Sequence, residues 1–262
     1  MDKLISKESL KSVMSKRIEG RSDAREISSF LMEEAACNNV DARRACAKAD
    51  FEQQEARLLK MEYPEHIGMS PNGFLDGYIH PYWKLIDERG AFGKNLIIVS
   101  ENFLSIPKKL SLLEWKGNRG KNYLDLSKLR NAEGVEIPQF PYVALDVEDG
   151  RAMKNISPDG CVAPFKKNSR LGFVANEGIM VVTYDLSVLE DHGIWCLGSR
   201  FGSFSVPGFC VSDALVVLLC PDSAPRTSAG APPLAVVGWC LGLRNLGPLG
   251  FLFFGLWNLL KG

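Results

Sequence analysis

Five residues with reactive or polar side chains fall at the ends of predicted structural elements, and they are Glu177, Ser199, Arg200, Trp239 and Cys240. Arg200 follows a Gly-Ser turn after a short apolar segment. From such a turn a guanidinium can reach a carboxylate or phosphate and bind it through two parallel hydrogen bonds. We therefore predict that these five residues form a ligand-binding corner with Arg200 as its anchor.

A structural interpretation of the same corner stays open. Arg200 can instead pair with Glu177 and fasten the turn to the start of a helix, and Trp239 and Cys240 can be ordinary core residues of a strand. A catalytic interpretation makes Glu177 a general base, which requires a raised pKa. Burial beside Ile179 would raise that pKa, whereas an ion pair with Arg200 would lower it.

Other kinds of active site have weaker support in the sequence. His192 and Cys196 are four residues apart, but a predicted helix end separates them, so we expect no metal site. Ser199 and His192 can be combined with Asp185 or Asp191 into a catalytic triad, although the Gly-x-Ser-x-Gly elbow is missing. The loop at residues 117–121 lacks the Walker A pattern, and no Gly-x-Gly-x-x-Gly sequence occurs, so no cofactor is expected.

The first part of the chain, residues 1–62, is predicted to be helical. Apolar residues recur there at helical spacing, and Asp41 can cap a helix that ends before Tyr63-Pro64. Residues 65–93 are rich in Pro, Gly, Asn and Asp, which predicts turns.

The second part, residues 63–245, is predicted to be a mixed domain. Strands are expected near Leu96, Tyr142, Ile194, Phe204, Leu215 and Leu234. A short helix is expected from Ser157-Pro158. Asn176 can cap a further helix that continues to Gly193, and the strand after it leads into the Gly198-Ser199-Arg200 turn. The predicted fold class is α+β.

Composition narrows the possible partners and the compartment. The 31 basic and 31 acidic residues cancel, so no overall field attracts nucleic acid, which we do not expect as a partner. The chain has seven cysteines, which is an odd number, and no two of them form a Cys-x-x-Cys pair. The N-terminus has charges every few residues and no apolar signal core. These features favour a cytoplasmic protein with free thiols.

The C-terminal tail, residues 246–262, is strongly apolar. A membrane-spanning helix needs roughly 20 apolar residues, and glycines and a proline interrupt this shorter run. Core packing is the favoured interpretation. Homo-oligomer formation through the tail and peripheral membrane attachment remain alternatives.

Several motifs occur in an order that resembles a bacterial family described as a domain of unknown function. They are FEQQEARLLKMEYPEHIGMS, GVEIP, PYVALDVEDG, NEGIMVVTYDLSVL, LGSRFG, SVPGF and VVGWC, and they cover about residues 51–243. The resemblance implies a soluble protein of mixed α and β structure and brings no known activity. It matches Glu177, the Gly198-Ser199-Arg200 turn and the Gly238-Trp239-Cys240 strand. The polar histidine-containing end of the family is absent here.

Three functional hypotheses follow from the sequence. The first is a protein that binds a small anionic ligand or a protein partner through Arg200. The second is a hydrolase or transferase in which Glu177 is the base and Arg200 holds an anionic substrate. The third is a peripheral membrane protein attached by its tail.

Overall fold

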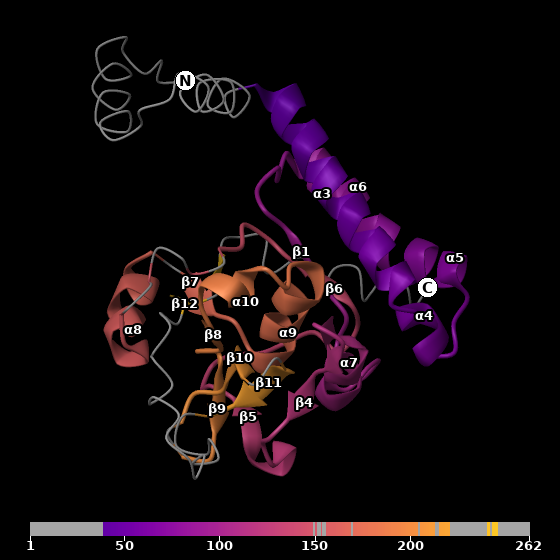
Figure 1. The fold of residues 1–262 in the computed structure, drawn as a ribbon. Coiled ribbons are helices and arrows are strands. Elements are labelled where there is room, and N and C mark those ends of the chain that lie inside the picture. Colours follow the sequence, from indigo (N-terminus) through magenta and orange to yellow (C-terminus); the bar gives the residue numbers. More distant parts are fainter. Residues whose placement is uncertain are drawn as a thin grey trace, which may run out of the picture. The chain divides into compact units, whose positions relative to one another are not determined.

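The computed structural model describes residues 39–148, 150, 153, 156–168, 170–203, 205–212, 215–220, 240–241 and 243–245. The chain divides into two compact units, residues 1–46 and 47–262. The described residues of the first unit form the beginning of helix α3, which spans Val40–Lys60. The rest of α3 and all further elements belong to the second unit, and Figure 1 labels them along the chain.

Helix α3 ends as the sequence predicts, near a proline. Lys60 is its last residue, and the short helix α4, Tyr63–His66, follows with Pro64 in its first turn. A proline is tolerated there because the first N–H groups of a helix have no partner within the helix.

Residues 65–93 are largely helical, so the prediction of a turn-rich region was wrong. Helix α5 spans Pro71–Phe74, a π-helical turn spans Leu75–Ile79, and helix α6 spans His80–Arg89. The prolines lie in first turns, where they start helices, and Ser70 caps α5 by accepting the N–H of Gly73. Gly90 then ends α6 in the left-handed conformation.

Strands β1, Leu96–Ile98, and β6, Tyr142–Ala144, form an antiparallel pair in which Ile97 is opposite Val143. The free edge of β1 is satisfied by side chains. Gln54 of α3 accepts the N–H of Ile97 at 2.8 Å, and the hydroxyl of Tyr184 donates to the Ile97 carbonyl at 2.8 Å. This short pair therefore needs no third strand to satisfy its backbone.

The largest sheet among the described residues has the order β12-β8-β10-β11-β4. Strands β8, β10 and β11 are antiparallel neighbours in this sheet, whereas β12 and β4 join its edges in parallel. The strands are β4, Lys121–Asn122; β8, Ile194–Trp195; β10, Gly208–Ser212; β11, Leu215–Leu219; and β12, Cys240–Leu241.

Smaller pairs surround this sheet. Strands β2, Glu114–Trp115, and β3, Asn118–Arg119, form a hairpin at the start of the loop that lacks the Walker A pattern. The remaining pairs are β5, Leu129–Asn131, with β9, Ser199–Phe201, and β7, Arg170–Gly172, with β13, Leu243–Asn245. A 3-10 turn at Leu126–Lys128 precedes β5, and helix α8, Pro158–Lys167, packs against β7.

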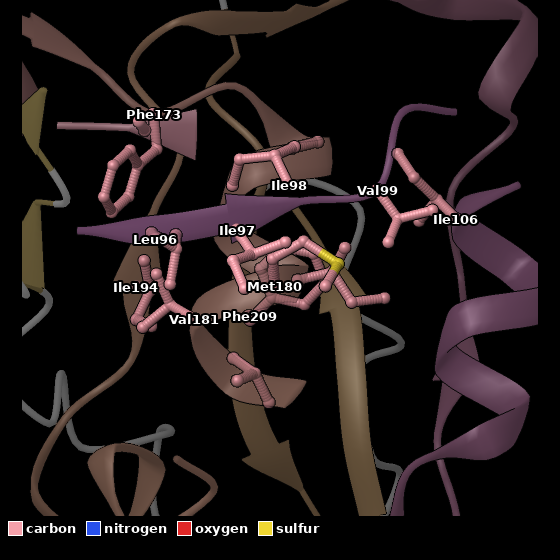
Figure 2. Close-up of a cluster of buried hydrophobic side chains, with 14 of the residues drawn as sticks. Leu96, Ile97, Ile98, Val99, Ile106, Phe173, Met180, Val181, Ile194 and Phe209 are labelled. Atoms are coloured by element: carbon pink, nitrogen blue, oxygen red, sulfur yellow. The ribbon is translucent and has the colours of Figure 1, made fainter. Parts of the chain in front are cut away.

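Helix α9, Ala175–Tyr184, is the central element, because it contacts β1, β10 and the helix α7, Ile106–Leu112 (Figure 1). Figure 2 shows side chains of β1, α9 and β10 gathered around Ile97, Met180 and Phe209. Residues 175–183 are all buried, so α9 is a core helix with no side that faces solvent.

Two predicted boundaries around α9 were wrong. Its N-cap residue is Val174, which places Asn176 inside the first turn, and the helix ends at Tyr184 well before Gly193. A separate helix, α10, spans Val188–Asp191. Asp185 breaks the run by adopting an extended conformation and accepting the N–H of Ser187, as Asp often does at turns.

The fold class is α+β, as predicted. Among the helices that the structure describes, none combines the length and the apolar character that a membrane crossing requires. The expected strand at Leu234, the start of the expected strand at Phe204 and the apolar tail lie outside the described residues.

Candidate functional site

A pocket lies at the N-terminal end of α9. The space between its lining atoms amounts to about 340 Å³, including the open mouth. Its polar lining residues are Glu101, Arg130, Asn131, Asn176 and Ser199, and its apolar ones are Ile106, Leu126, Leu129, Ile137, Val174 and Ala175. Residues from five separate stretches of the chain therefore meet at the start of one buried helix.

The first N–H groups of α9 have different partners. The Ala175 N–H donates to the hydroxyl of Ser199 at 2.9 Å, and the Glu177 N–H donates to the Val174 carbonyl at 2.9 Å. No described residue accepts the backbone N–H of Asn176, which lies between them. Because unpaired N–H groups give a helix N-terminus a partial positive charge, this end of the pocket favours an anion.

Ser199 is brought to the pocket by the approach of β9 to α9. Gly198 makes this approach possible, since a Cβ there would collide with the carbonyl of Gly172. The Gly198 N–H donates to the Phe173 carbonyl at 2.8 Å, and the Ala132 N–H donates to the Gly198 carbonyl at 2.7 Å. Gly198 is in a turn, as predicted, which the Ser199 N–H closes by donating to the Cys196 carbonyl at 2.9 Å, and Ser199 begins β9.

Glu177 is fully buried and has structural partners. Its Oε1 accepts the hydroxyl of Tyr142 at 2.7 Å, and its Oε2 accepts the N–H of Val174 at 3.0 Å. The second bond is the acidic half of a capping box. Glu177 does not line the pocket, so the structure places this carboxylate behind the helix start, away from a bound molecule.

Arg200 does not pair with Glu177. Its Nη1 donates to the carbonyls of Leu197 at 2.7 Å and Ser199 at 2.8 Å, which fastens the guanidinium to its own turn. The Arg200–Glu177 pair expected as the structural alternative does not form, because Arg200 donates to its own turn and Glu177 accepts from Tyr142 and Val174.

Arg130 is the arginine that lines the pocket, and it was not selected from the sequence. It lies directly opposite Arg200 in the antiparallel β5–β9 pair, so both side chains leave the same face of the ribbon. The Arg130 side chain is exposed and binds no described residue. Two like charges at opposed positions repel each other unless an anion lies between or beside them.

Lys109 is a second residue that sequence analysis missed. It belongs to α7 and is fully buried, with its ammonium donating to the Val99 carbonyl at 2.5 Å and to the side-chain oxygen of Asn176. The Asn176 amide also donates to the Val99 carbonyl, at 3.1 Å. Burial lowers the pKa of Lys109 from 10.5 to about 7, against an opposing effect of the Glu101 charge.

A signal for Lys109 was present in the sequence. Ile106, Leu110 and Leu113 recur at helical spacing on one apolar face, and Lys109 falls on that face. No comparable signal marks Arg130, because nothing in its local sequence indicates that β5 pairs with β9.

The remaining predicted residues take other places. Cys240 is in β12, which pairs with β8, and Trp239 lies outside the described residues. His192 and Cys196 are buried in the core. The Asp185 carboxylate accepts the Ser187 hydroxyl at 2.5 Å, and the Ser199 hydroxyl caps α9, so neither forms the triad considered from the sequence.

The fold and the pocket together define an α+β protein with a small polar site at the start of its central helix. Comparison with protein families gives the family: residues 57–241 match the model of a family of unknown function, DUF5701, and the chain belongs to it. The matched region includes every residue that lines the pocket. No curated protein and no solved structure matches the chain.

Proposed function

We propose that this protein binds a small anionic molecule in the pocket at the start of α9, with Arg130 as the residue that contacts the anion. The observation that carries the proposal is the placement of Arg130 in the pocket opposite Arg200, with both side chains on one face. An arginine suits a carboxylate or phosphate because its planar fork donates two parallel hydrogen bonds.

The helix end supports the same ligand class. The N–H of Asn176, which no described residue accepts, lies at the N-terminus of α9, where anions are stabilised by the aligned peptide dipoles. The Ser199 hydroxyl already caps the preceding N–H. The proposed ligand therefore has two donors available in the pocket, the backbone N–H of Asn176 and the guanidinium of Arg130.

Glu101 restricts the ligand further. It lines the same pocket, and its carboxylate repels an anion unless the ligand also offers a hydrogen-bond donor. We infer a ligand that combines an anionic group with a hydroxyl or ammonium group.

We also propose a cytoplasmic, bacterial setting for this activity. The described cysteines Cys46, Cys161, Cys196, Cys210 and Cys220 are free thiols, which agrees with a reducing compartment. The family resemblance supports the bacterial origin.

Thermal unfolding with three four-carbon dicarboxylates tests the proposed ligand class. Malate carries a hydroxyl and aspartate an ammonium group where succinate carries only hydrogen, and inorganic phosphate completes the set. Because a molecule that binds only the folded protein raises Tm, we expect malate or aspartate to raise Tm more than succinate does.

Variants connect this stabilisation to the pocket. Arg130→Gln should abolish the increase in Tm, Arg200→Gln should reduce it, and Glu101→Gln should make succinate as effective as malate. Arg119→Gln is the matched control, because Arg119 is an exposed arginine of the β2–β3 hairpin outside the pocket. If none of the four compounds stabilises the wild type, or if Arg130→Gln responds as the wild type does, the proposed function is wrong.

A further inference from the structure

Lys109 is a buried cation without a carboxylate partner. Its ammonium contacts two neutral acceptors, the Val99 carbonyl and the Asn176 side-chain oxygen, and it forms no ion pair with a described residue. Lysine is rarely fully buried unless it is paired, because moving a charge out of water is costly. The bonds to Val99 and Asn176 come from neutral acceptors, and the charge of Glu101 stabilises the ammonium too little to offset its burial.

Lys109 lies directly behind the wall of the pocket. Asn176, which accepts its hydrogen bond, lines the pocket, and so does Ile106, one helical turn before Lys109 on the same face of α7. Figure 2 shows Val99 next to Ile106, where the segment after β1 meets α7. An anion in the pocket is thus separated from the ammonium by the side chain of Asn176.

The charged groups around Lys109 come from four parts of the fold. Glu101, from the segment after β1, is the carboxylate whose charge acts on it, and Arg130 is the cation in the pocket. The carboxylate of Glu177 in α9 accepts hydrogen bonds from Tyr142 and Val174. Strands β3 and β4, which pack against α7, carry Arg119 and Lys121, and both are exposed to solvent.

We propose that Lys109 is a specificity-determining residue of this pocket, and that its buried charge selects an anionic ligand and is compensated by it through Asn176. This inference rests on the proposed function, because it supplies the charge that such a ligand balances. Binding then stabilises the ammonium form. Because the pKa of Lys109 in the free protein is about 7, a fraction of the molecules carries a neutral amine near neutral pH. These molecules take up a proton on binding.

The neutral amine of Lys109 accepts one proton from solvent as the anion enters, and no covalent bond of the ligand changes. The proton comes from the buffer, so the heat of binding must depend on the ionisation enthalpy of the buffer used.

Isothermal titration calorimetry with malate tests the inference. Both carboxyl groups of malate stay ionised between pH 6.5 and 9, so the ligand contributes no proton change of its own. In two buffers of different ionisation enthalpy, wild-type protein should show net proton uptake that is small at pH 6.5, is largest between the pKa of free Lys109 and its raised pKa in the complex, and falls again at higher pH. Affinity should fall with rising pH over the same range.

Two lysine variants separate this role from a structural one. Lys109→Met should show no proton uptake and bind malate at least about tenfold more weakly at pH 7, a change that corresponds to about 1.4 kcal/mol. Lys108→Met is the matched control, because Lys108 is the exposed neighbour on the same helix, and it should bind as the wild type does. If Lys109→Met does not fold, the measurement of proton uptake by the wild type alone tests the role of Lys109.

The outcomes distinguish the inference from the function on which it rests. Malate binding without proton uptake at any of these pH values overturns the role of Lys109 and leaves the anion site in place. Failure of malate, aspartate, succinate and phosphate to bind at all overturns both.

Discussion

The hydroxyl of Tyr142 in β6 donates a hydrogen bond of 2.7 Å to the carboxylate of Glu177 in α9. Both side chains are buried, so this bond connects the short β1–β6 pair to the helix on which the pocket is built. The other carboxylate oxygen holds the N–H of Val174. Glu177 thereby fixes where α9 begins.

Tyr142→Phe should destabilise the protein. Removing the hydroxyl leaves a buried carboxylate with one donor fewer, which costs about 1–3 kcal/mol. Urea unfolding should show a lower midpoint with an unchanged slope. Tyr123→Phe serves as the control because Tyr123 is 47% exposed, and its midpoint should stay at the wild-type value. Equal midpoints for the two variants would contradict a structural role of the Tyr142 hydroxyl.

Ser199→Ala should also reduce stability, by about 1 kcal/mol, since it removes the hydroxyl that accepts the Ala175 N–H at the helix start. Differential scanning calorimetry compares the Tm of Ser199→Ala with the Tm values of the wild type and of Ser203→Ala. Ser203 is exposed in the next turn and should be replaceable without a change in Tm. A Ser199→Ala protein as stable as the wild type would show that water or another group caps α9 equally well.

Gly178→Ala tests how tightly α9 packs on the sheet. A Cβ at this position would lie 2.5 Å from the Cys196 sulfur and 3.0 Å from the Phe209 ring, and such overpacking typically costs about 1–3 kcal/mol. Gly77→Ala is the matched change in another helical segment, with no atom within 4 Å of the new Cβ. It should be neutral or stabilise by about 0.4–1 kcal/mol, because alanine has fewer conformations to lose on folding. Chemical denaturation of both variants distinguishes steric crowding from helix propensity.

Lys109 predicts a specific dependence of stability on pH. Its pKa is about 7 in the folded protein and 10.5 ordinarily. Between these values the unfolded chain holds more protons than the folded one, so the free energy of unfolding rises with pH. Below pH 7 both states are protonated and the cost of burying the charge is fully present.

The check compares unfolding free energies from pH 6 to pH 10. The difference between wild type and Lys109→Met should change across this range in favour of the wild type as pH increases. The difference between wild type and Lys108→Met should stay constant. A constant difference for Lys109→Met would mean that the buried ammonium keeps an ordinary pKa.

Much of the fold could be predicted because its signals are local. The apolar runs at Leu96, Tyr142, Ile194 and Leu215 are short and rich in β-branched or aromatic residues, and each contains a strand. Residues 65–93 show the limit of such signals. Pro71 and Pro81 mark turns in most contexts, yet here they start helices that pack against the core.

The candidate site was predicted only in part. Ser199 lies in the pocket and Glu177 at the helix start, where the sequence placed them, but Arg200 is fastened to its own turn. Arg130 and Lys109 could not be assigned from the sequence, because their roles depend on partners 70 and 67 residues away in the chain.

The sequence by itself determined the α+β class, the presence of helix α9 but not its bounds, the small residues before Arg200 and the family to which the chain belongs. Only the tertiary structure decided which charges meet. The pairing of β5 with β9 sets Arg130 opposite Arg200, and the packing of α7 on α9 buries Lys109 against Asn176. The local spacing of apolar residues indicates which side chains will be buried. Electrostatic contacts depend instead on distances between segments that the chain brings together only when it folds.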